Sequence, residues 1–339
     1  MRPYRLLLAA VVLCLSLTLH AQKPASLIHP GDVWLDNRGV PIQAHGGGVI
    51  RVGKLFYWFG EDRTPTNDPN TRYVACYASR DLAHWQYRGQ VFQLKPTAEL
   101  GDWIILERPK VFYNAKTKTY VMYVHLDGPG PGGHGHGYDM ARVAVATSKR
   151  VTGPYTYVRS FRPLNQESRD IGQFVDDDGS AYLIFESRPT GGFYIAQLSD
   201  DYLDVKTSTS FVHAPLEGGA LVHLNGLYYV LGSHMSGWKP NPNVYATAPT
   251  LAGPWTAFEN IAPPATNTYD SQSAFLLKVT GSKTTSVIYI GDRWEPKTLP
   301  DSRYIWMPLE IGDGHMSLPE LRPWSIDTHT GETKIANQP

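Results

Sequence analysis

The stretch Glu107-Arg108-Pro109-Lys110-Val111-Phe112-Tyr113-Asn114 begins with a charged residue, continues as an apolar strand and ends at a turn. An aromatic strand follows at residues 120–125, a third strand at residues 142–148 and a short fourth at residues 155–158. Four consecutive strands of this kind are typical of one blade of a β-propeller. The quoted stretch is therefore predicted to be the innermost strand of a blade.

The same pattern occurs five times along the chain. The first strands are predicted at residues 45–52, 107–114, 170–177, 217–224 and 272–279, and the second strands at residues 56–60, 120–125, 182–186, 228–232 and 287–291. The third strands are predicted at residues 73–79, 142–148, 193–198, 243–247 and 303–309. A β-sandwich, the alternative all-β fold, gives no reason for one unit to recur. We therefore predict an all-β, five-bladed β-propeller, in which residues 27–41 complete the last blade and close the ring.

The composition agrees with an all-β fold and limits the possible partners. Only 18% of the residues are charged, while 31 Gly, 26 Pro and 12% aromatic residues favour turns and strands over a helix bundle. The 31 Lys and Arg residues balance 31 Asp and Glu residues, so the net charge is zero. This balance argues against a nucleic-acid partner, which usually requires a basic surface.

The N-terminus has the features of a secretory signal peptide. Arg2 and Arg5 precede an apolar run at residues 6–19, and a small-residue cleavage site follows at Ala21. The apolar run is shorter than the roughly 20 residues that a membrane-spanning helix needs, which argues against a membrane anchor. We therefore predict a signal peptide at residues 1–21, export to the periplasm or the medium, and no membrane attachment after cleavage. Residues 22–339 are predicted to form a single propeller domain.

The first residues of the five predicted inner strands are candidates for one functional site. The first strand of each propeller blade lines the central channel, so these residues converge although they lie far apart in sequence. They are His45, Glu107, Asp170, Glu217 and Gln272. Carboxylates that share a pocket shift each other's pKa values, and one that stays protonated can act as a general acid. Because glycosidases use a pair of Asp or Glu residues, the pattern indicates cleavage of a glycosidic bond.

Eight short segments carry a resemblance to a known family. In chain order they are Gln43-Ala44-His45-Gly46-Gly47-Gly48, Tyr57-Trp58-Phe59-Gly60-Glu61, Glu107-Arg108-Pro109-Lys110-Val111, Ser168-Arg169-Asp170 with Asp176-Asp177-Asp178-Gly179, Leu231-Gly232-Ser233-His234, Trp238-Lys239-Pro240-Asn241-Pro242-Asn243, Ser271-Gln272-Ser273 and Gly291-Asp292-Arg293-Trp294. Together they resemble glycoside hydrolase family 43, and in particular its exo-β-1,3-galactanase subgroup, over essentially the whole mature chain. The resemblance implies an exo-acting enzyme that releases galactose from β-1,3-galactan, the arabinogalactan backbone, with inversion.

The resemblance also implies roles for the residues that lead the strands. Glu217 matches the general acid, and Asp170 matches the residue that modulates its pKa. His45 stands where most of the family has a general-base Asp, a departure that is itself typical of the galactanase subgroup. There the resemblance implies that Gln272 orients or deprotonates the water, with Glu107 close by. An amide is a very poor base, so Glu107 is an alternative base, and both residues remain candidates.

Further residues are candidates for binding the sugar. Glu61 and Glu186 are expected to hydrogen-bond sugar hydroxyls, and Tyr123, Trp238 and Trp294 are expected to stack on sugar rings. No cofactor is expected to be required. The resemblance makes a calcium ion on the propeller axis possible, with His45 as the nearest side chain.

Two alternatives to a galactanase remain open at this stage. The same fold could carry an α-L-arabinofuranosidase or a β-D-galactofuranosidase, because loop residues decide the specificity. The chain could also be a non-catalytic propeller that binds sugars. In each case the expected partner is an oligosaccharide or polysaccharide.

Overall fold

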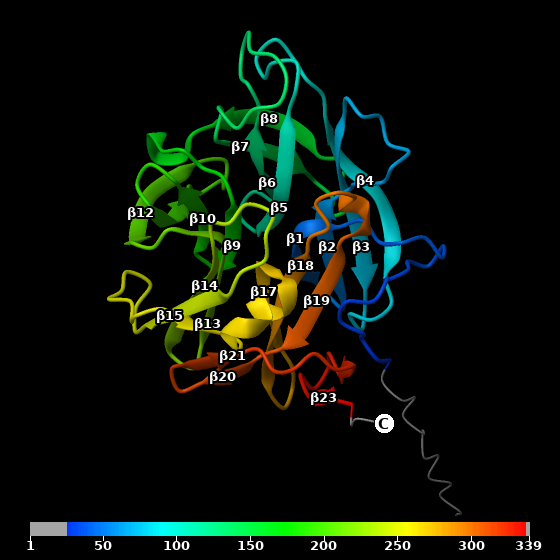
Figure 1. The fold of residues 1–339 in the computed structure, drawn as a ribbon, viewed down its shortest axis with the longest axis vertical. Coiled ribbons are helices and arrows are strands. Elements are labelled where there is room, and N and C mark those ends of the chain that lie inside the picture. Colours follow the sequence, from blue (N-terminus) through cyan, green and yellow to red (C-terminus); the bar gives the residue numbers. More distant parts are fainter. Residues whose placement is uncertain (1–25, 337–339) are drawn as a thin grey trace, which may run out of the picture.

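The computed structural model describes residues 26–336, which form five blades around a central axis (Figure 1). The first two blades are antiparallel four-stranded sheets: β1 (His45–Val52), β2 (Leu55–Glu61), β3 (Arg72–Ser79) and β4 (Gln86–Leu94), then β5 (Ile105–Asn114), β6 (Thr119–Asp127), β7 (Arg142–Ser148) and β8 (Thr156–Phe161). The third contains β9 (Ile171–Val175), β10 (Ala181–Ser187), β11 (Gly192–Leu198) and β12 (Val205–Val212). The fourth contains β13 (Leu216–Leu224), β14 (Leu227–His234), β15 (Asn243–Ala248) and β16 (Glu259–Asn260), and the fifth contains β17 (Gln272–Thr280), β18 (Thr285–Arg293) and β19 (Arg303–Pro308).

The innermost strands make the ring. Each of β1, β5, β9, β13 and β17 contacts the next, and β17 contacts β1, so the circle of blades is closed. This arrangement confirms the predicted five-bladed β-propeller. Residues 27–41 do not supply a regular fourth strand to the last blade. They contribute a backbone hydrogen bond of 2.8 Å from Gly31 N to Tyr304 O on β19, and a bridge between Ile28 and Trp324.

The remaining elements lie between the blades or after the last one. Short helices span Pro163–Asn165 (η1), Pro264–Thr266 (η2), Asn267–Asp270 (α1) and Leu299–Asp301 (η3). Two hairpins follow the fifth blade: β20 (Glu310–Gly312) with β21 (His315–Ser317), and β22 (Trp324–Ile326) with β23 (Thr333–Ile335). Within residues 26–336, no helix has both the length and the apolar character that crossing a bilayer requires.

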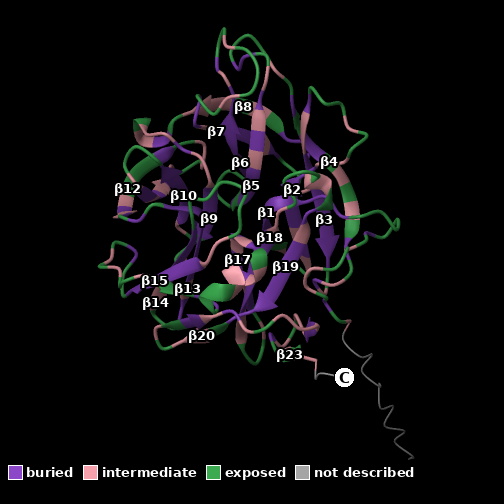
Figure 2. Ribbon diagram, viewed as in Figure 1, coloured by how far each residue is buried: buried purple, intermediate pink, exposed green. Residues whose placement is uncertain are grey.

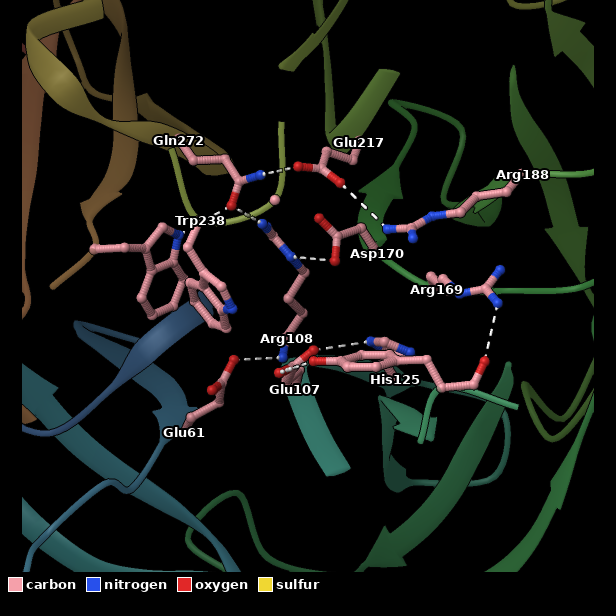
Figure 3. A pocket seen from close by; sticks show the side chains of 13 residues that line it. Glu61, Glu107, Arg108, His125, Arg169, Asp170, Arg188, Glu217, Trp238 and Gln272 are labelled. Atoms are coloured by element: carbon pink, nitrogen blue, oxygen red, sulfur yellow. Dashed lines mark hydrogen bonds and ion pairs between the residues drawn. The ribbon is translucent and has the colours of Figure 1, made fainter. Parts of the chain in front are cut away.

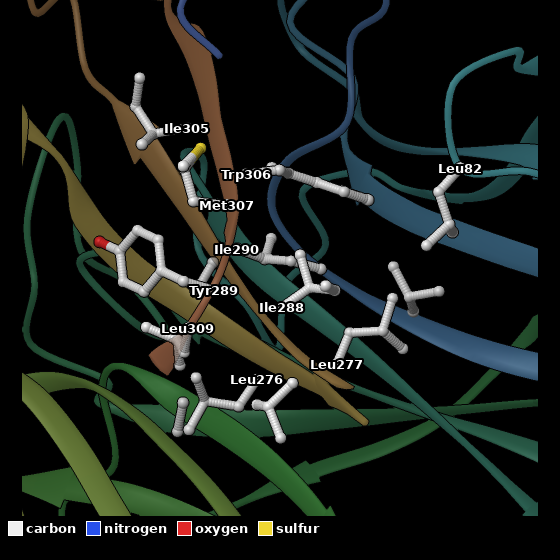
Figure 4. Packing of buried hydrophobic residues seen from close by; sticks show 14 of the residues in the cluster. Leu82, Leu276, Leu277, Ile288, Tyr289, Ile290, Ile305, Trp306, Met307 and Leu309 are labelled. Carbon is white, nitrogen blue, oxygen red and sulfur yellow. The ribbon is translucent and has the colours of Figure 1, made fainter. Parts of the chain in front are cut away.

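The hydrophobic core lies mainly between neighbouring blades. Strand residues alternate between the two faces of a sheet, and both faces are covered by the adjacent blades, so the middle strands are buried along most of their length (Figure 2). The largest cluster joins the first, fourth and fifth blades and includes Trp58. Figure 4 shows part of this cluster, with Tyr289 and Trp306 labelled. The Trp58 and Trp306 rings meet edge to face with centroids 4.8 Å apart. This packing holds the blades at the fixed angles that the site requires.

A bulge near the start of the inner strands directs side chains toward one end of the channel. The pairing of inner and second strands shifts register directly after His45, Glu107, Glu217 and Ser273. After the first three of these residues the backbone has positive φ, at Gly46, Arg108 and Gly218. Bulges re-aim side chains and often lie beside active sites. Four of the five blades therefore carry a bulge beside the end of the channel where their inner strands start.

Candidate active site

One pocket of about 200 Å³ lies where the inner strands begin (Figure 3). All five blades contribute side chains to it, so the prediction that the leading residues converge is met by four of the five. Its lining residues are Glu61, Glu107, Arg108, His125, Tyr138, Arg169, Asp170, Arg188, Glu217, Gly237, Trp238, Gln272 and Trp294. The pocket thus combines several carboxylates, three arginines and two tryptophans.

Glu217 lies in an environment that favours its protonated form. Its Oε1 accepts a 3.0 Å hydrogen bond from Gln272 Nε2, and Arg188 lies 3.5 Å from Oε2. Burial raises the pKa of Glu217 to about 8, and the nearby charges of Asp170 and Glu186 add to this effect. Carboxylate oxygens of these three residues lie within 4.8 Å of one another. Glu217 is therefore suited to donate a proton near neutral pH.

Asp170 is held between the second and fourth blades. Its Oδ1 lies 2.9 Å from Arg108 Nε, and its Oδ2 accepts a 3.0 Å hydrogen bond from the backbone N–H of Gly218. Gly218 directly follows Glu217, so Asp170 fixes the backbone at the proposed acid. Asp170 thus pairs with Arg108, and its nearby charge raises the pKa of Glu217 in addition to burial.

Gln272 has all four of its amide hydrogen-bonding positions filled. Its Oε1 accepts from Arg108 at 2.5 Å and from Trp294 Nε1 at 2.9 Å. Its Nε2 donates to Glu217 Oε1 at 3.0 Å and to Ser233 Oγ at 3.1 Å. Arginine and indole nitrogens can only donate, so the amide oxygen must face them and the NH₂ group must face Glu217. This arrangement positions Gln272 as a hydrogen-bond donor to the acid.

Glu107 lies in the opposite kind of environment. Its Oε2 is 3.2 Å from His125 Nδ1, its Oε1 is 3.6 Å from Arg63, and Tyr138 donates to Oε1 at 3.4 Å. Burial raises the pKa of Glu107, but His125, Arg63 and Arg108 outweigh burial and hold the pKa below its ordinary value. Glu107 is therefore an ionised carboxylate that can accept a proton. Figure 3 shows Arg108 and Asp170 between Glu107 and Glu217.

The other predicted sugar-binding residues fall into two groups. Glu61, Trp238 and Trp294 line the pocket, and Trp238, which is 41% exposed, meets Trp294 edge to face at 5.3 Å. The predictions for Glu186 and Tyr123 were wrong. Glu186 is 1% exposed and lies beneath the pocket, where it pairs with Arg188 at 2.7 Å. Tyr123 is fully buried between blades, and its hydroxyl donates to Tyr202 O.

The axis of the ring does not fit a calcium ion. Lys110, from the second inner strand, is fully buried and donates from Nζ to Gly46 O at 2.7 Å and to Gly47 O at 3.2 Å. Carbonyl oxygens of this kind are what calcium would need as ligands. His45 is also engaged, since its ring nitrogens contact Asp292 Oδ1 and Gln43 Oε1. The Lys110 amine therefore already binds carbonyl oxygens that directly follow His45 in the sequence, and His45 does not line the pocket.

The clusters of carboxylates in the pocket do not fit a metal either. Glu107, His125 and Asp170 bring ligand atoms within 4.8 Å of one another. Both ring nitrogens of His125, however, face carboxylates, which raise its pKa to about 10 against the opposing effect of burial. A protonated imidazole has no lone pair for a metal. Arg108 and Arg188 supply the positive charge beside Asp170, Glu186 and Glu217.

Several residues of the site were not predicted from the sequence. These are Arg108, His125, Tyr138, Arg169 and Arg188. Strand register offers a signal for one of them, because His125 pairs directly with Glu107. In the same way, the residue paired with His45 on the second strand is Glu61, the partner of Glu217 is Ser233, and the partner of Gln272 is Asp292. The residue opposite a strand leader is therefore a second place to look for site residues in this fold.

Comparison with known proteins assigns the family. The sequence profile described as Glycosyl hydrolases family 43 matches residues 41–275, more than half of the chain. The chain belongs to glycosyl hydrolases family 43. No curated protein sequence matches it significantly. Three solved structures extend this family assignment.

The first similar structure is a variant of an exo-β-1,3-galactanase from Phanerochaete chrysosporium with β-1,3-galactotriose. It is 41% identical, with 91% of this chain and 70% of that chain covered and a TM-score of 0.82. An exo-β-1,3-galactanase from Clostridium thermocellum is 36% identical, with 91% and 68% covered and a TM-score of 0.82. A β-1,3-galactosidase of family 43, solved with galactodeoxynojirimycin, is 32% identical, with 86% and 97% covered and a TM-score of 0.76. This family 43 chain is thus similar to enzymes named for β-1,3-linked galactose.

Proposed function

We propose that this family 43 enzyme removes galactose from the end of β-1,3-galactan with inversion of the anomeric configuration. One observation carries the proposal: Glu217 and Glu107 face the same pocket with pKa values displaced in opposite directions. An inverting glycosidase needs one protonated carboxylic acid and one carboxylate. The substrate follows from the similar galactanases, one of which was solved with β-1,3-galactotriose.

The acid side of the mechanism uses Glu217. Its proton passes to the glycosidic oxygen as the bond from that oxygen to the anomeric carbon breaks. Asp170 and Glu186 keep the proton on Glu217 before the reaction, because their charges disfavour a third carboxylate. Gln272 donates to Glu217 Oε1 and stabilises the carboxylate that forms. The leaving part of the galactan departs as a neutral alcohol.

The base side uses Glu107. A water molecule attacks the anomeric carbon from the opposite face and gives its proton to the Glu107 carboxylate, so that the product is the inverted hemiacetal. Gln272 was the other candidate base. Arg108 and Trp294 both donate hydrogen bonds to its amide oxygen. To act as a base, Gln272 would have to adopt the imidic-acid tautomer, in which this oxygen carries a proton, and the two donors oppose that tautomer. This hydrogen-bond pattern supports Glu107 as the base and Gln272 as a positioning group.

The pocket supports binding of a chain end. It encloses about 200 Å³, a size suited to one sugar ring, and the exposed Trp238 lies at its edge beside Trp294. A terminal galactose would enter the pocket, and Trp238 offers a face to the ring that follows.

The test is hydrolysis of β-1,3-galactan, followed by proton NMR from the first minutes of the reaction. Galactose released first as the α-anomer is the expected result, and first release of the β-anomer would overturn inversion. A panel of aryl glycosides is measured in parallel. Turnover of an α-L-arabinofuranoside or β-D-galactofuranoside without galactan turnover would assign the alternative specificity. Binding of galactan without any turnover would assign a sugar-binding propeller instead.

We also propose that the enzyme is exported. The proposal rests on the charged, apolar and small-residue order of residues 1–21, which lie outside the described residues. N-terminal sequencing of protein from the periplasm and the medium should find Gln22 as the first residue. A mature protein that keeps residues 1–21 would overturn this proposal.

A further inference from the structure

A buried aspartate, Asp127, binds both ends of the loop that carries Tyr138 to the pocket beside Glu107. Asp127, the last residue of β6, is fully buried, and its Oδ1 accepts backbone hydrogen bonds of 3.0 Å from Gly128, Met140 and Ala141. These donors lie at the two ends of the connection between β6 and β7. The aspartate therefore fixes both ends of a loop whose residue Tyr138 reaches into the pocket.

The second oxygen of Asp127 is connected to the pocket by His125, which contacts both Asp127 and Glu107. Asp127 Oδ2 lies 3.1 Å from His125 Nε2, and His125 Nδ1 lies 3.2 Å from Glu107 Oε2. His125 is almost completely buried, and strand pairing places it directly opposite Glu107. The three side chains form a line from the base of the loop to the carboxylate proposed as the base.

We propose that Asp127 and His125 form a positioning pair that orients Glu107 and keeps it ionised, and that links this state to the closed loop at residues 128–141. The inference rests on the proposed function, in which Glu107 takes the proton from water. Neither Asp127 nor His125 is proposed to exchange a proton with the substrate. Their role resembles that of an outer carboxylate that holds a histidine in one orientation and stabilises its charged form.

The loop reaches Glu107 by a second route. Tyr138 donates its hydroxyl to Glu107 Oε1 at 3.4 Å, and its backbone oxygen accepts from Arg169 at 3.0 Å. Tyr138 and His125 thus contact different oxygens of Glu107. A loosened loop would release the Tyr138 contact, whereas the His125 ring depends on Asp127 through the 3.1 Å contact of its Nε2.

The charged groups around this line favour a protonated histidine. Two carboxylates face the ring of His125, and against the opposing effect of burial they raise its pKa to about 10. The other titratable or charged groups that face Glu107 or the pair are Glu61 on β2, Arg63 after β2, Arg108 on β5, Tyr138 in the loop, Arg169 and Asp170 before β9, and Glu186 on β10. Arg63 and Arg108 also lower the pKa of Glu107, so His125 is one of three cations that favour its ionised form.

The decisive variant is Asp127→Asn, which keeps the size and the oxygen acceptor but removes the charge. His125 should then lose its proton more easily, and the pKa of Glu107 should rise. The acidic limb of kcat/KM against pH is therefore expected to move to higher pH. We also expect kcat on a β-1,3-galactooligosaccharide to fall roughly tenfold, with a much smaller change in KM.

Two further variants separate positioning from folding. Asp36→Asn removes another buried aspartate, which accepts backbone hydrogen bonds from Arg38 and Val40 and lies outside the pocket. It should lower Tm without moving the pH profile. His125→Gln keeps Asp127 as the loop anchor and should move the acidic limb as Asp127→Asn does. An acidic limb unchanged in both Asp127→Asn and His125→Gln would overturn the inference.

A measurement that does not depend on turnover distinguishes this inference from the proposed function. The imidazole of His125 can be titrated by NMR in the wild type and in Asp127→Asn. The wild-type ring should stay protonated above pH 8, and the variant ring should lose its proton at lower pH. Equal titration in both proteins would overturn the positioning pair even if galactan is cleaved. A wild type that cleaves no galactan, but in which the two titrations differ, would overturn only the proposed function.

Discussion

Glu217 and Glu107 lie near the start of inner strands of different blades, and each is followed by a bulge and a residue with positive φ. Their surroundings nevertheless shift their pKa values in opposite directions. Burial, together with the charges of Asp170 and Glu186, raises the pKa of Glu217 although Arg188 lies 3.5 Å away. At Glu107, the cations His125, Arg63 and Arg108 outweigh burial and lower the pKa. Two residues of the same type and in the same position of the repeat thus acquire opposite pKa shifts. In this protein the neighbours on other strands, not the repeat itself, decide which glutamate can act as acid.

Arg108 separates the two halves of the pocket. It follows Glu107 in sequence, but its guanidinium reaches Asp170 and Gln272 on the acid side. The arginine pairs with the carboxylate that raises the pKa of Glu217, and it also orients the amide that contacts Glu217. A change at either glutamate should therefore affect one half of the pocket more than the other.

The strongest test of the comparison is Glu217→Gln, which removes the acidic proton. Without protonation of the leaving group, kcat on β-1,3-galactan should fall about 10³-fold. An aryl galactoside whose leaving group needs no proton should lose much less activity. Glu259→Gln, on the exposed strand β16, serves as the control and should behave like the wild type. Equal losses on both substrates would contradict the assignment of Glu217 as acid.

The second largest loss of activity is expected for a variant of Glu107. Glu107→Ala should lower kcat about 10²-fold, because no carboxylate remains to accept the proton of water. Azide, which needs no base, should restore turnover and produce α-galactosyl azide. The same measurement on Gln272→Ala provides the comparison. Rescue of Gln272→Ala in place of Glu107→Ala would assign the base to Gln272.

The pH dependence sharpens the contrast further. Glu217 must be protonated, so kcat/KM of the wild type should fall as the pH rises through about 8. Asp170→Asn removes a charge that raises the pKa of Glu217, so the basic limb should move to lower pH. Its kcat should fall roughly tenfold at the optimum, because part of the acid is then ionised. A basic limb that stays in place or moves upward would refute this account of the pKa.

The smallest expected effect concerns binding alone. Trp238 contributes an exposed ring at the edge of the pocket and makes no hydrogen bond to Glu107 or Glu217. Trp238→Ala should raise KM for galactooligosaccharides about fivefold, which corresponds to about 1 kcal/mol of stacking. Its kcat and pH profile should be unchanged. A large loss in kcat with unchanged KM would show that Trp238 acts on the reaction and not on binding.

The sequence was informative where the repeat governs position. Alternation and turn residues predicted the strands, and the first residues of the inner strands predicted Glu107, Asp170, Glu217 and Gln272 as one site. Arg108 was not predicted as a site residue. In a regular strand it would point away from its neighbour Glu107, and the bulge that redirects it is not visible in the alternation.

The errors have a related cause. Tyr123 and His125 are two residues apart on β6, yet Tyr123 packs between blades and His125 faces the pocket. The β5 bulge lies between their partners, since His125 pairs with Glu107 and Tyr123 pairs with Lys110. Glu186 is buried beneath the pocket and pairs with Arg188, which lines the pocket in its place. Depth below the surface depends on the neighbouring blades and could not be predicted from one strand.

Lys110 links two neighbouring blades by hydrogen bonds from its side chain. Its amine joins the second blade to carbonyl groups of the first blade. Because this link is made by a side chain of the polypeptide, a chelator such as citrate should not break it. The arrangement also restricts evolution of the first blade, since a Cβ on Gly48 would lie 3.1 Å from Lys110 Cδ. A larger residue there would require the Lys110 side chain to shift by a few tenths of an ångström.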